Sequence, residues 1–184
     1  MTPSMAAPKL HGEVRDSVGD MLVDSRLPLS PDLSYATVDV VNGDVTIVVG
    51  FTPGTFDRES MGADVFLDAD QNPSTGASSS QGIVAGADFL IDLDVRQSAG
   101  SAGDISTYSS RNCSSTFFLR CFTSLGRLNV TATENALQAI VPLSMLNGTD
   151  GHVTFQVRSY AVTPVFTFDT DLMPDANVPP VRVQ

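Results

Sequence analysis

Oxygen-bearing side chains alternate in one short segment of the sequence, at Asp68, Asp70 and Asn72. A hard cation such as Ca²⁺ takes roughly six to eight oxygen ligands from carboxylates, amides, carbonyls and water. An acidic loop with this spacing can turn its side-chain oxygens onto one centre. The loop is not an EF-hand, because Pro73 and Ser79 occupy the positions where that motif has glycine and glutamate. The segment therefore predicts a calcium loop of another kind.

A fourth oxygen ligand is expected from the apolar segment that follows, residues 87–95. Its alternating pattern, ADFLIDLDV, predicts a strand, and Asp88 stands at the start of it. If this strand pairs with the strand predicted at residues 63–70, Asp88 approaches the acidic loop. Mg²⁺ is a poorer fit than Ca²⁺ because it demands stricter geometry. The sequence thus predicts Ca²⁺ as cofactor, with four ligands: Asp68, Asp70, Asn72 and Asp88.

An interpretation without a metal stays open for the same residues. Asp and Asn side chains also cap backbone amides in Asx turns, which need no cation. Three neighbouring aspartates, Asp64, Asp92 and Asp94, are interpreted as a solvated strand face rather than as ligands.

The sequence predicts no catalytic residue. Neither the G-x-S-x-G motif nor a phosphate-binding P-loop is present. The two histidines, His11 and His152, have no recognisable partner for catalysis or for zinc. A small hydrolase that uses two opposed Asp carboxylates remains an alternative.

Two cysteines, Cys113 and Cys121, are separated by seven residues. In an oxidising compartment this spacing predicts a disulfide that staples a short loop or two adjacent hairpin strands. In the cytosol the same residues would be two thiols. We expect the disulfide, because other features of the sequence are typical of extracellular proteins.

The composition favours strands over helices. Of the 21 acidic residues 18 are Asp, and of the ten basic residues nine are Arg, so the helix-forming Glu and Lys are scarce. Runs of β-branched residues recur between turn clusters such as Asn42-Gly43, which is a strong hairpin signal. About ten strands at this spacing predict an all-β fold with little helix, an antiparallel two-sheet β-sandwich of jelly-roll type.

A chain of 184 residues is expected to form one domain with tails. We interpret residues 1–31 as an N-terminal arm with a short strand at residues 10–14. Residues 32–170 would form the β-sandwich, with one helical turn at residues 143–146. Residues 171–184 are expected to be a Pro-rich extended tail.

Charge and hydropathy limit the partners. The formal net charge of −11 argues against nucleic acid, because phosphate binding needs a basic surface. No apolar run approaches the roughly 18 residues of a membrane span. The N-terminal segment MTPSMAAPKL also lacks the apolar core of a signal peptide.

The run VFLDADQNPSTG, followed by GADFLIDL, resembles a pattern in secreted bacterial β-sandwich modules, namely the calcium-containing carbohydrate-binding modules and DOMON-like domains. The match covers about 30 residues, from Asp64 to Leu93. The resemblance implies a calcium ion with a structural role on Asp68, Asp70, Asn72 and Asp88. It also implies an extracellular or cell-surface location and a glycan or surface polymer as partner.

The sequence therefore favours a secreted, calcium-stabilised, non-catalytic β-sandwich module with a binding or accessory role. One alternative is a structural or adhesive surface protein that self-associates through its sheet edges. The hydrolase is the second alternative.

Overall fold

The computed structural model describes residues 9–27, 29–77, 86–94, 102–109, 121–147, 149–175 and 178–184. Every pair of neighbouring strands is antiparallel. In these ranges, helical conformation is limited to Cys121 and to the 3-10 turn Leu143–Met145, where the sequence predicts a helical turn. The predicted antiparallel, nearly all-β fold is thus confirmed. The strands are β1 (Leu10–Arg15), β2 (Leu33–Val41), β3 (Asp44–Phe51), β4 (Met61–Asp68), β5 (Phe89–Asp94), β6 (Ala102–Tyr108), β7 (Phe122–Ala132), β8 (Ala136–Pro142), β9 (Thr154–Val162), β10 (Thr167–Met173) and β11 (Val181–Arg182).

The β2–β3 hairpin shows how local sequence makes these strands. Buried and less buried residues alternate along both strands, which is the period of a strand with one face in the core. Asn42 and Gly43 connect them with φ angles of 54° and 88°. Both residue types adopt this left-handed region readily, so the turn predicted at this dipeptide forms.

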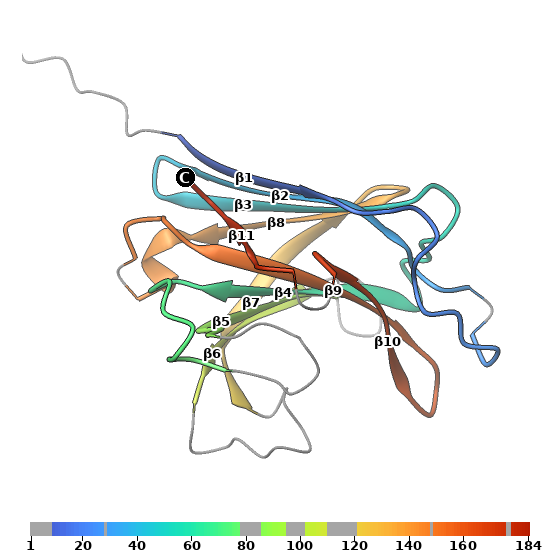
Figure 1. The fold of residues 1–184 in the computed structure, drawn as a ribbon. Helices are drawn as coiled ribbons and strands as arrows, with labels where there is room; N and C mark the ends of the chain where they lie inside the picture. Colours follow the sequence, from blue (N-terminus) through green and yellow to red (C-terminus); the bar gives the residue numbers. More distant parts are fainter. Residues whose placement is uncertain are drawn as a thin grey trace, which may run out of the picture.

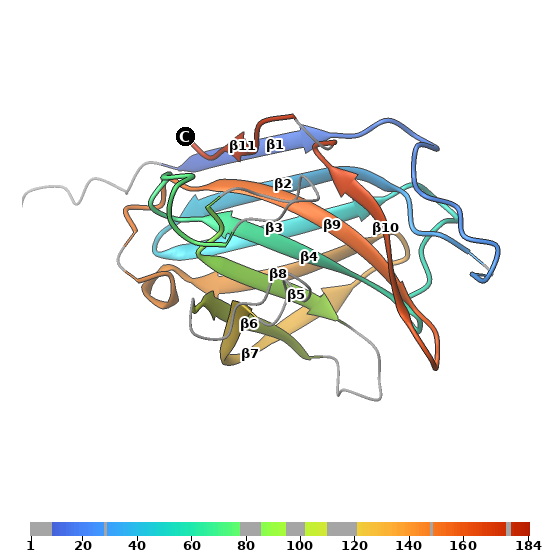
Figure 2. The same ribbon diagram turned by 60° about the horizontal axis from the view of Figure 1, so that its bottom comes forward.

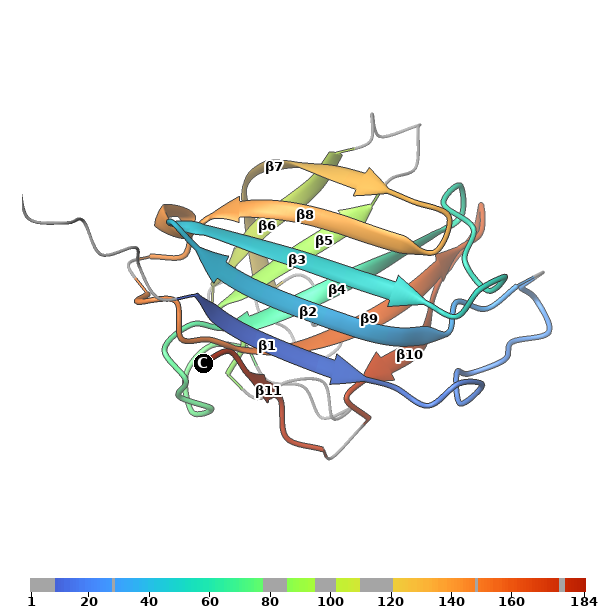
Figure 3. The same cartoon turned by 90° about the horizontal axis from the view of Figure 1, so that it is seen from above.

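Two layers of strands pack face to face (Figure 1). One layer contains β1, β2, β3 and β8, and the other contains β6, β5, β4, β9 and β10. Seen from above, the first layer lies across the second (Figure 3). Strand β7 joins them, because its residues 122–129 pair with β6 and its residues 130–132 pair with β8.

The opposite side of the molecule is bridged by the C-terminal strand. Strand β11 pairs with β9, and His11 of β1 exchanges two backbone hydrogen bonds with Gln184, at 3.1 and 3.3 Å. Figure 2 shows β11 beside β1. The strands therefore form one nearly closed, barrel-like antiparallel sheet. A division into the two separate sheets of a jelly roll stays a prediction, since β7 belongs to both layers.

The core fills the space between the layers. Burying each large apolar side chain there stabilises the fold by roughly 1.5–3 kcal/mol. Representative members from the first layer are Val38, Ile47, Leu137 and Val141, and from the second Val65, Ile91, Phe155 and Val157.

Strand β4 is buried on both faces, since all eight of its residues are buried. A second apolar cluster of Phe66, Ala77, Ala87 and Leu90 lies on its outer side. Ala77 and Ala87 form an isolated antiparallel bridge, so the two described parts of the connection from β4 to β5 pair with each other here. The last residue of β4, Asp68, is consequently buried as well.

The terminal segments contribute strands to the sheet. The predicted arm, residues 1–31, contains β1, which includes the predicted strand at residues 10–14. The predicted tail, residues 171–184, contains the end of β10 and all of β11. In the described ranges, no helix has the length and apolar character needed to cross a membrane.

Candidate metal centre

The pairing of β4 with β5 brings the two ends of the acidic loop together. Leu67 of β4 lies opposite Phe89 of β5, and the backbone N–H of Asp88 donates to the carbonyl of Leu67 at 2.8 Å. Asp68 leaves β4 at the point where Asp88 enters β5. The neighbouring strands on which the sequence prediction depended are therefore present.

Three of the four predicted ligands converge. Asp68, Asp70 and Asp88 each offer one carboxylate oxygen, and these oxygens lie within 4.8 Å of one another. In the described part of the chain, neither Lys nor Arg forms an ion pair with any of the three. Three carboxylates at this separation repel one another unless a proton or a cation lies among them.

Asp68 is the most unusual member of this group. The residue is 3% exposed, and its buried Oδ1 atom has no hydrogen-bond partner. Burial, then the interaction with Asp70 and the charge of Asp88, raises the pKa of Asp68 to about 6. Leaving a buried polar atom unpaired costs on the order of 1–3 kcal/mol, so native proteins rarely do so. A cation bound at this oxygen would remove the cost.

The other two carboxylates are held by backbone groups of the same loop. Asp88 Oδ2 accepts from the N–H groups of Ala69 and Asp70, at 3.0 and 3.3 Å. Burial and the nearby charge of Asp70 raise the pKa of Asp88, although these two N–H groups lower it. The N–H of Asn72 and the hydroxyl of Thr75 donate to Asp70, and these contacts lower its pKa.

The fourth predicted ligand, Asn72, takes part in a turn. Its Oδ1 accepts from the N–H of Ser74 at 3.1 Å, and its own N–H donates to Asp70 Oδ1 at 2.9 Å. Between them Gln71 has a φ of 54°. The Asx turns of the metal-free interpretation are thus present in the same loop that gathers the three carboxylates.

Two glycines let the loop return to Asp68. Gly86 has a φ of 91°, and a Cβ added there would lie 2.8 Å from Pro73 Cα and 3.2 Å from Asp68 Oδ2. Gly76 has a φ of 67°, and its added Cβ would lie 2.6 Å from the carbonyl oxygens of Gly86 and Ala87. Sequence reasoning missed this requirement, although both glycines flank the acidic segment.

The donor set is chemically suited to calcium. All three converging groups are carboxylates, which hard cations prefer, and neither His nor Cys belongs to the cluster. The unpaired Oδ1 of Asp68 is one vacant donor, and Asp70 and Asp88 supply the others. The residues present therefore fit a hard divalent cation.

The interpretation of Asp64 and Asp94 as a solvated strand face is wrong. Asp64 is 4% exposed and Asp94 is 8% exposed. Asp64 forms a buried ion pair with Arg158, which also donates to Asp169 at 3.0 Å. Alternation alone could not reveal this, because the partner comes from a strand 94 residues further along the chain. Asp92 is half-buried, and its carboxylate accepts from the Tyr160 hydroxyl at 2.7 Å.

Sequence reasoning also missed a second acidic group at the segment that follows β1. Asp20 belongs to two clusters of three carboxylates, one with Asp16 and Asp175 and one with Asp32 and Asp171. Burial raises the pKa of Asp16 to about 7 and that of Asp171 to about 6. No local sequence motif predicts this group, because only tertiary folding brings its residues together.

The remaining predicted residues lie elsewhere. His11 is close to Asp39, with Nδ1 and Oδ1 at 2.9 Å, and His152 lies beside the acidic loop. Cys121 is buried, whereas Cys113 lies outside the described residues, so the Cys113–Cys121 disulfide stays a prediction. Compared with the models of known protein families and with curated proteins, the sequence matches none.

Proposed function

We propose that this chain is a calcium-stabilised, non-catalytic β module with a binding or accessory role. Asp68, Asp70 and Asp88 would hold the ion, and Asn72 would supply a fourth oxygen after a change of its side-chain rotamer. The observation that carries the proposal is the buried carboxylate of Asp68, whose Oδ1 has no hydrogen-bond partner and which converges with two further carboxylates.

The position of the site supports a structural role for the ion. The acidic loop connects two central strands, β4 and β5, and its bridged residues Ala77 and Ala87 belong to the outer apolar cluster. An ion that fixes the loop would also hold these two residues against Phe66 and Leu90. We further propose that the two layers correspond to the sheets of a jelly-roll-like sandwich, joined through β7.

The resemblance of residues 64–93 to secreted bacterial modules supports the biological setting. On that basis we propose an extracellular or cell-surface location and a glycan or surface polymer as partner. A surface domain of this kind needs stability without a chaperone, and a bound ion supplies it by mass action.

A thermal melt of the full chain in EDTA, in millimolar Ca²⁺ and in millimolar Mg²⁺ tests the proposal. The informative variant is Asp70→Asn, because asparagine keeps the Asx-turn acceptor but loses the charge. Asp44→Asn is the matched control, since Asp44 is also an exposed aspartate and lies on the β2–β3 hairpin.

We expect Ca²⁺ to raise the Tm of the wild type and of Asp44→Asn by several degrees, and Mg²⁺ to raise it less. Asp70→Asn should lose most of the calcium shift while melting in EDTA no lower than the wild type, because one of three repelling charges is gone. An equal calcium shift in both variants would refute the ligand assignment and favour Asx turns without a metal.

A further inference from the structure

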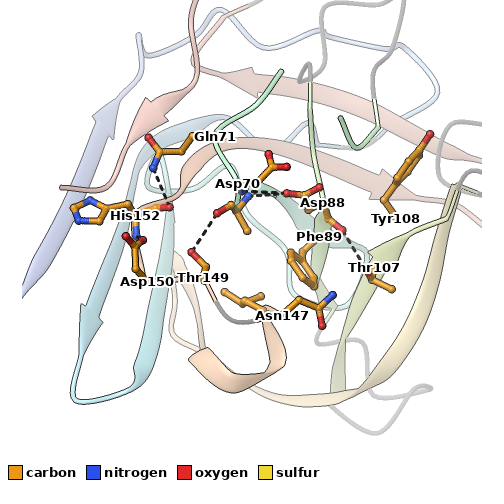
Figure 4. Close-up of a pocket in the computed structure, with 12 residues that line it drawn as sticks. Asp70, Gln71, Asp88, Phe89, Thr107, Tyr108, Asn147, Thr149, Asp150 and His152 are labelled. Atoms are coloured by element: carbon orange, nitrogen blue, oxygen red, sulfur yellow. Dashed lines mark hydrogen bonds between the residues drawn. The ribbon is translucent and has the colours of Figure 1, made fainter. Parts of the chain in front are cut away.

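A cavity of about 700 Å³ lies directly against the acidic loop. Residues 69–71 of that loop form one wall, and Phe89 with Thr107 forms another. The third wall comes from the segment between β8 and β9, including Asn147 and Thr149. Figure 4 shows these side chains around one space, with Asp70 and Asp88 along the same edge. The volume lies within the roughly 300–1,000 Å³ of small-molecule sites.

The charges of the lining decide which ligands fit. The described lining residues include three aspartates, Asp70, Asp88 and Asp150, and neither Lys nor Arg. An anion would be repelled by these carboxylates. An organic cation would compete with the metal for Asp70 and Asp88. A neutral ligand avoids both conflicts.

The lining also carries polar groups with free hydrogen-bonding capacity. Within the described part of the chain, the Asn147 amide, the Tyr108 hydroxyl and the His152 ring form no hydrogen bond. Phe89 and Leu146 lie behind the lining and are only 2% and 1% exposed, so they offer a ligand little apolar surface. A lining that offers both donors and acceptors and little apolar surface suits a neutral compound with several hydroxyl groups.

Two hydrogen bonds connect the metal loop to the opposite wall. The Thr149 hydroxyl donates to the carbonyl of Ala69 at 3.2 Å, and the Gln71 side-chain amide donates to the carbonyl of His152 at 3.3 Å. The Asp88 carboxylate accepts hydrogen bonds from the N–H groups of Ala69 and Asp70. An ion bound by Asp88 and Asp70 would therefore fix this wall of the cavity.

We propose that this cavity binds a neutral polyhydroxylated ligand, either a saccharide or a linear polyol, and that binding requires the ion in the adjacent loop. The dependence on the ion rests on the function proposed above, whereas the choice of ligand rests on the lining of the cavity.

The test is isothermal titration calorimetry of the full chain, in EDTA and in millimolar Ca²⁺. The neutral probes are maltotriose, cellotriose, xylotriose, N-acetylchitotriose and sorbitol, and spermidine serves as a cationic probe. Asn147→Gly removes one cavity amide without backbone strain, because Asn147 has a φ of 48°. Asn42→Gly is the matched control, with a φ of 54° in the distant β2–β3 turn. Thermal melts with Ca²⁺ accompany each titration.

We expect at least one neutral probe to bind in Ca²⁺ and to bind at least tenfold more weakly in EDTA. Asn147→Gly should weaken that binding by about tenfold through the lost hydrogen bonds, and Asn42→Gly should leave it unchanged. Binding of a trisaccharide without sorbitol identifies a saccharide site, and the reverse identifies a polyol site.

Other results would overturn the inference. If Ca²⁺ raises the Tm but no neutral probe binds, or Asn147→Gly binds as the wild type does, the cavity assignment is wrong and the metal site stands. Equal affinity in EDTA and Ca²⁺ refutes the dependence on the ion. Binding of spermidine that Ca²⁺ displaces refutes the neutral ligand. A Tm that Ca²⁺ leaves unchanged refutes the proposed metal site and, with it, the dependence on the ion.

Discussion

At the scale of single residues, the candidate centre depends on one carboxylate that is largely shielded from water. Asp68 ends a strand that is buried on both faces, and its Oδ1 has no partner. The aspartates that cap turns, such as Asp70, are exposed and accept from nearby N–H and hydroxyl groups. Burial therefore singles out Asp68 as the carboxylate that no Asx turn explains, whereas the exposed Asp70 is both a turn residue and a candidate ligand.

Gly86→Ala is expected to destabilise the loop more than any exposed glycine substitution does. An alanine there has both an unfavourable φ of 91° and a Cβ that meets Pro73 Cα at 2.8 Å. Gly54→Ala is the matched control, because Gly54 has a φ of 84° and an added Cβ meets nothing within 4 Å. Urea denaturation should show a loss of about 1–3 kcal/mol for Gly54→Ala and a clearly larger loss for Gly86→Ala. Equal losses of unfolding free energy in the two variants would mean that the loop has room for a side chain at Gly86.

The second acidic group should make stability fall as the pH rises. Burial raises the pKa of Asp16 from 3.8 to about 7, so between these values the folded chain keeps a proton that the unfolded chain has lost. The folded state then binds more protons, and its free energy of unfolding decreases with pH across this window.

Asp16→Asn should flatten that decrease. In EDTA at pH 7.5 we expect the variant to be more stable than the wild type by on the order of 1 kcal/mol, because Asp16 is only partly buried and solvent screens its charge. Asp44→Asn, at an exposed position, should keep the wild-type slope. Urea midpoints between pH 4.5 and 7.5 provide the measurement, and an unchanged slope in Asp16→Asn would contradict the assignment.

At the scale of elements, ion pairs connect the outer face of β4 to β9 and β10. Arg158 of β9 is 6% exposed and donates to Asp64 of β4 and to Asp169 of β10. A buried ion pair contributes little net stability, whereas removal of one partner leaves an uncompensated charge.

Arg158→Met is therefore expected to cost about 3–5 kcal/mol, because it leaves Asp64 buried without its cation. The double variant Asp64→Leu/Arg158→Met should recover most of that loss. Urea denaturation of both variants measures the difference. If the double variant is no more stable than Arg158→Met, the loss comes from packing and not from the unpaired charge.

Several of the turns and strands could be predicted from the sequence. The Asn42-Gly43 turn and the 3-10 turn at Leu143–Met145 follow from local patterns, because turn residues act over short distances. The pairing of β4 with β5 is an assumption of the ligand prediction, and the structure contains that pairing. The convergence of Asp68, Asp70 and Asp88 follows from the same pairing. The burial of Asp64 could not be predicted from local patterns, since it depends on the distant residue Arg158.

At the scale of the whole molecule, the sheet nearly closes because three distant segments meet. Val183 is 2% exposed and packs against Gly12 of β1, where an added Cβ would lie 2.9 Å from Val183 Cγ2. The backbone of Gln184 pairs with His11. Composition indicated a Pro-rich tail here, and no local pattern could show that its last residues bridge β1 and β9.

Deletion of residues 181–184 is expected to expose β1. The chain would lose a buried valine and the hydrogen bonds between His11 and Gln184, and we expect a Tm several degrees lower. Hydrogen exchange should accelerate in β1 and stay slow in β4, which lies inside the sheet. Gln184→Ala keeps the backbone bonds and serves as the control. Uniformly faster exchange in all strands would indicate global destabilisation rather than an open edge.

The most direct test of the central claim is a calcium titration of the EDTA-stripped full chain, with metal analysis of the untreated protein beside it. The three converging carboxylates predict one high-affinity Ca²⁺ per chain, weaker binding of Mg²⁺ and loss of that site in Asp70→Asn. If the titration shows no binding heat and the untreated protein contains no metal, the proposed calcium site is wrong and the acidic loop is a set of turns.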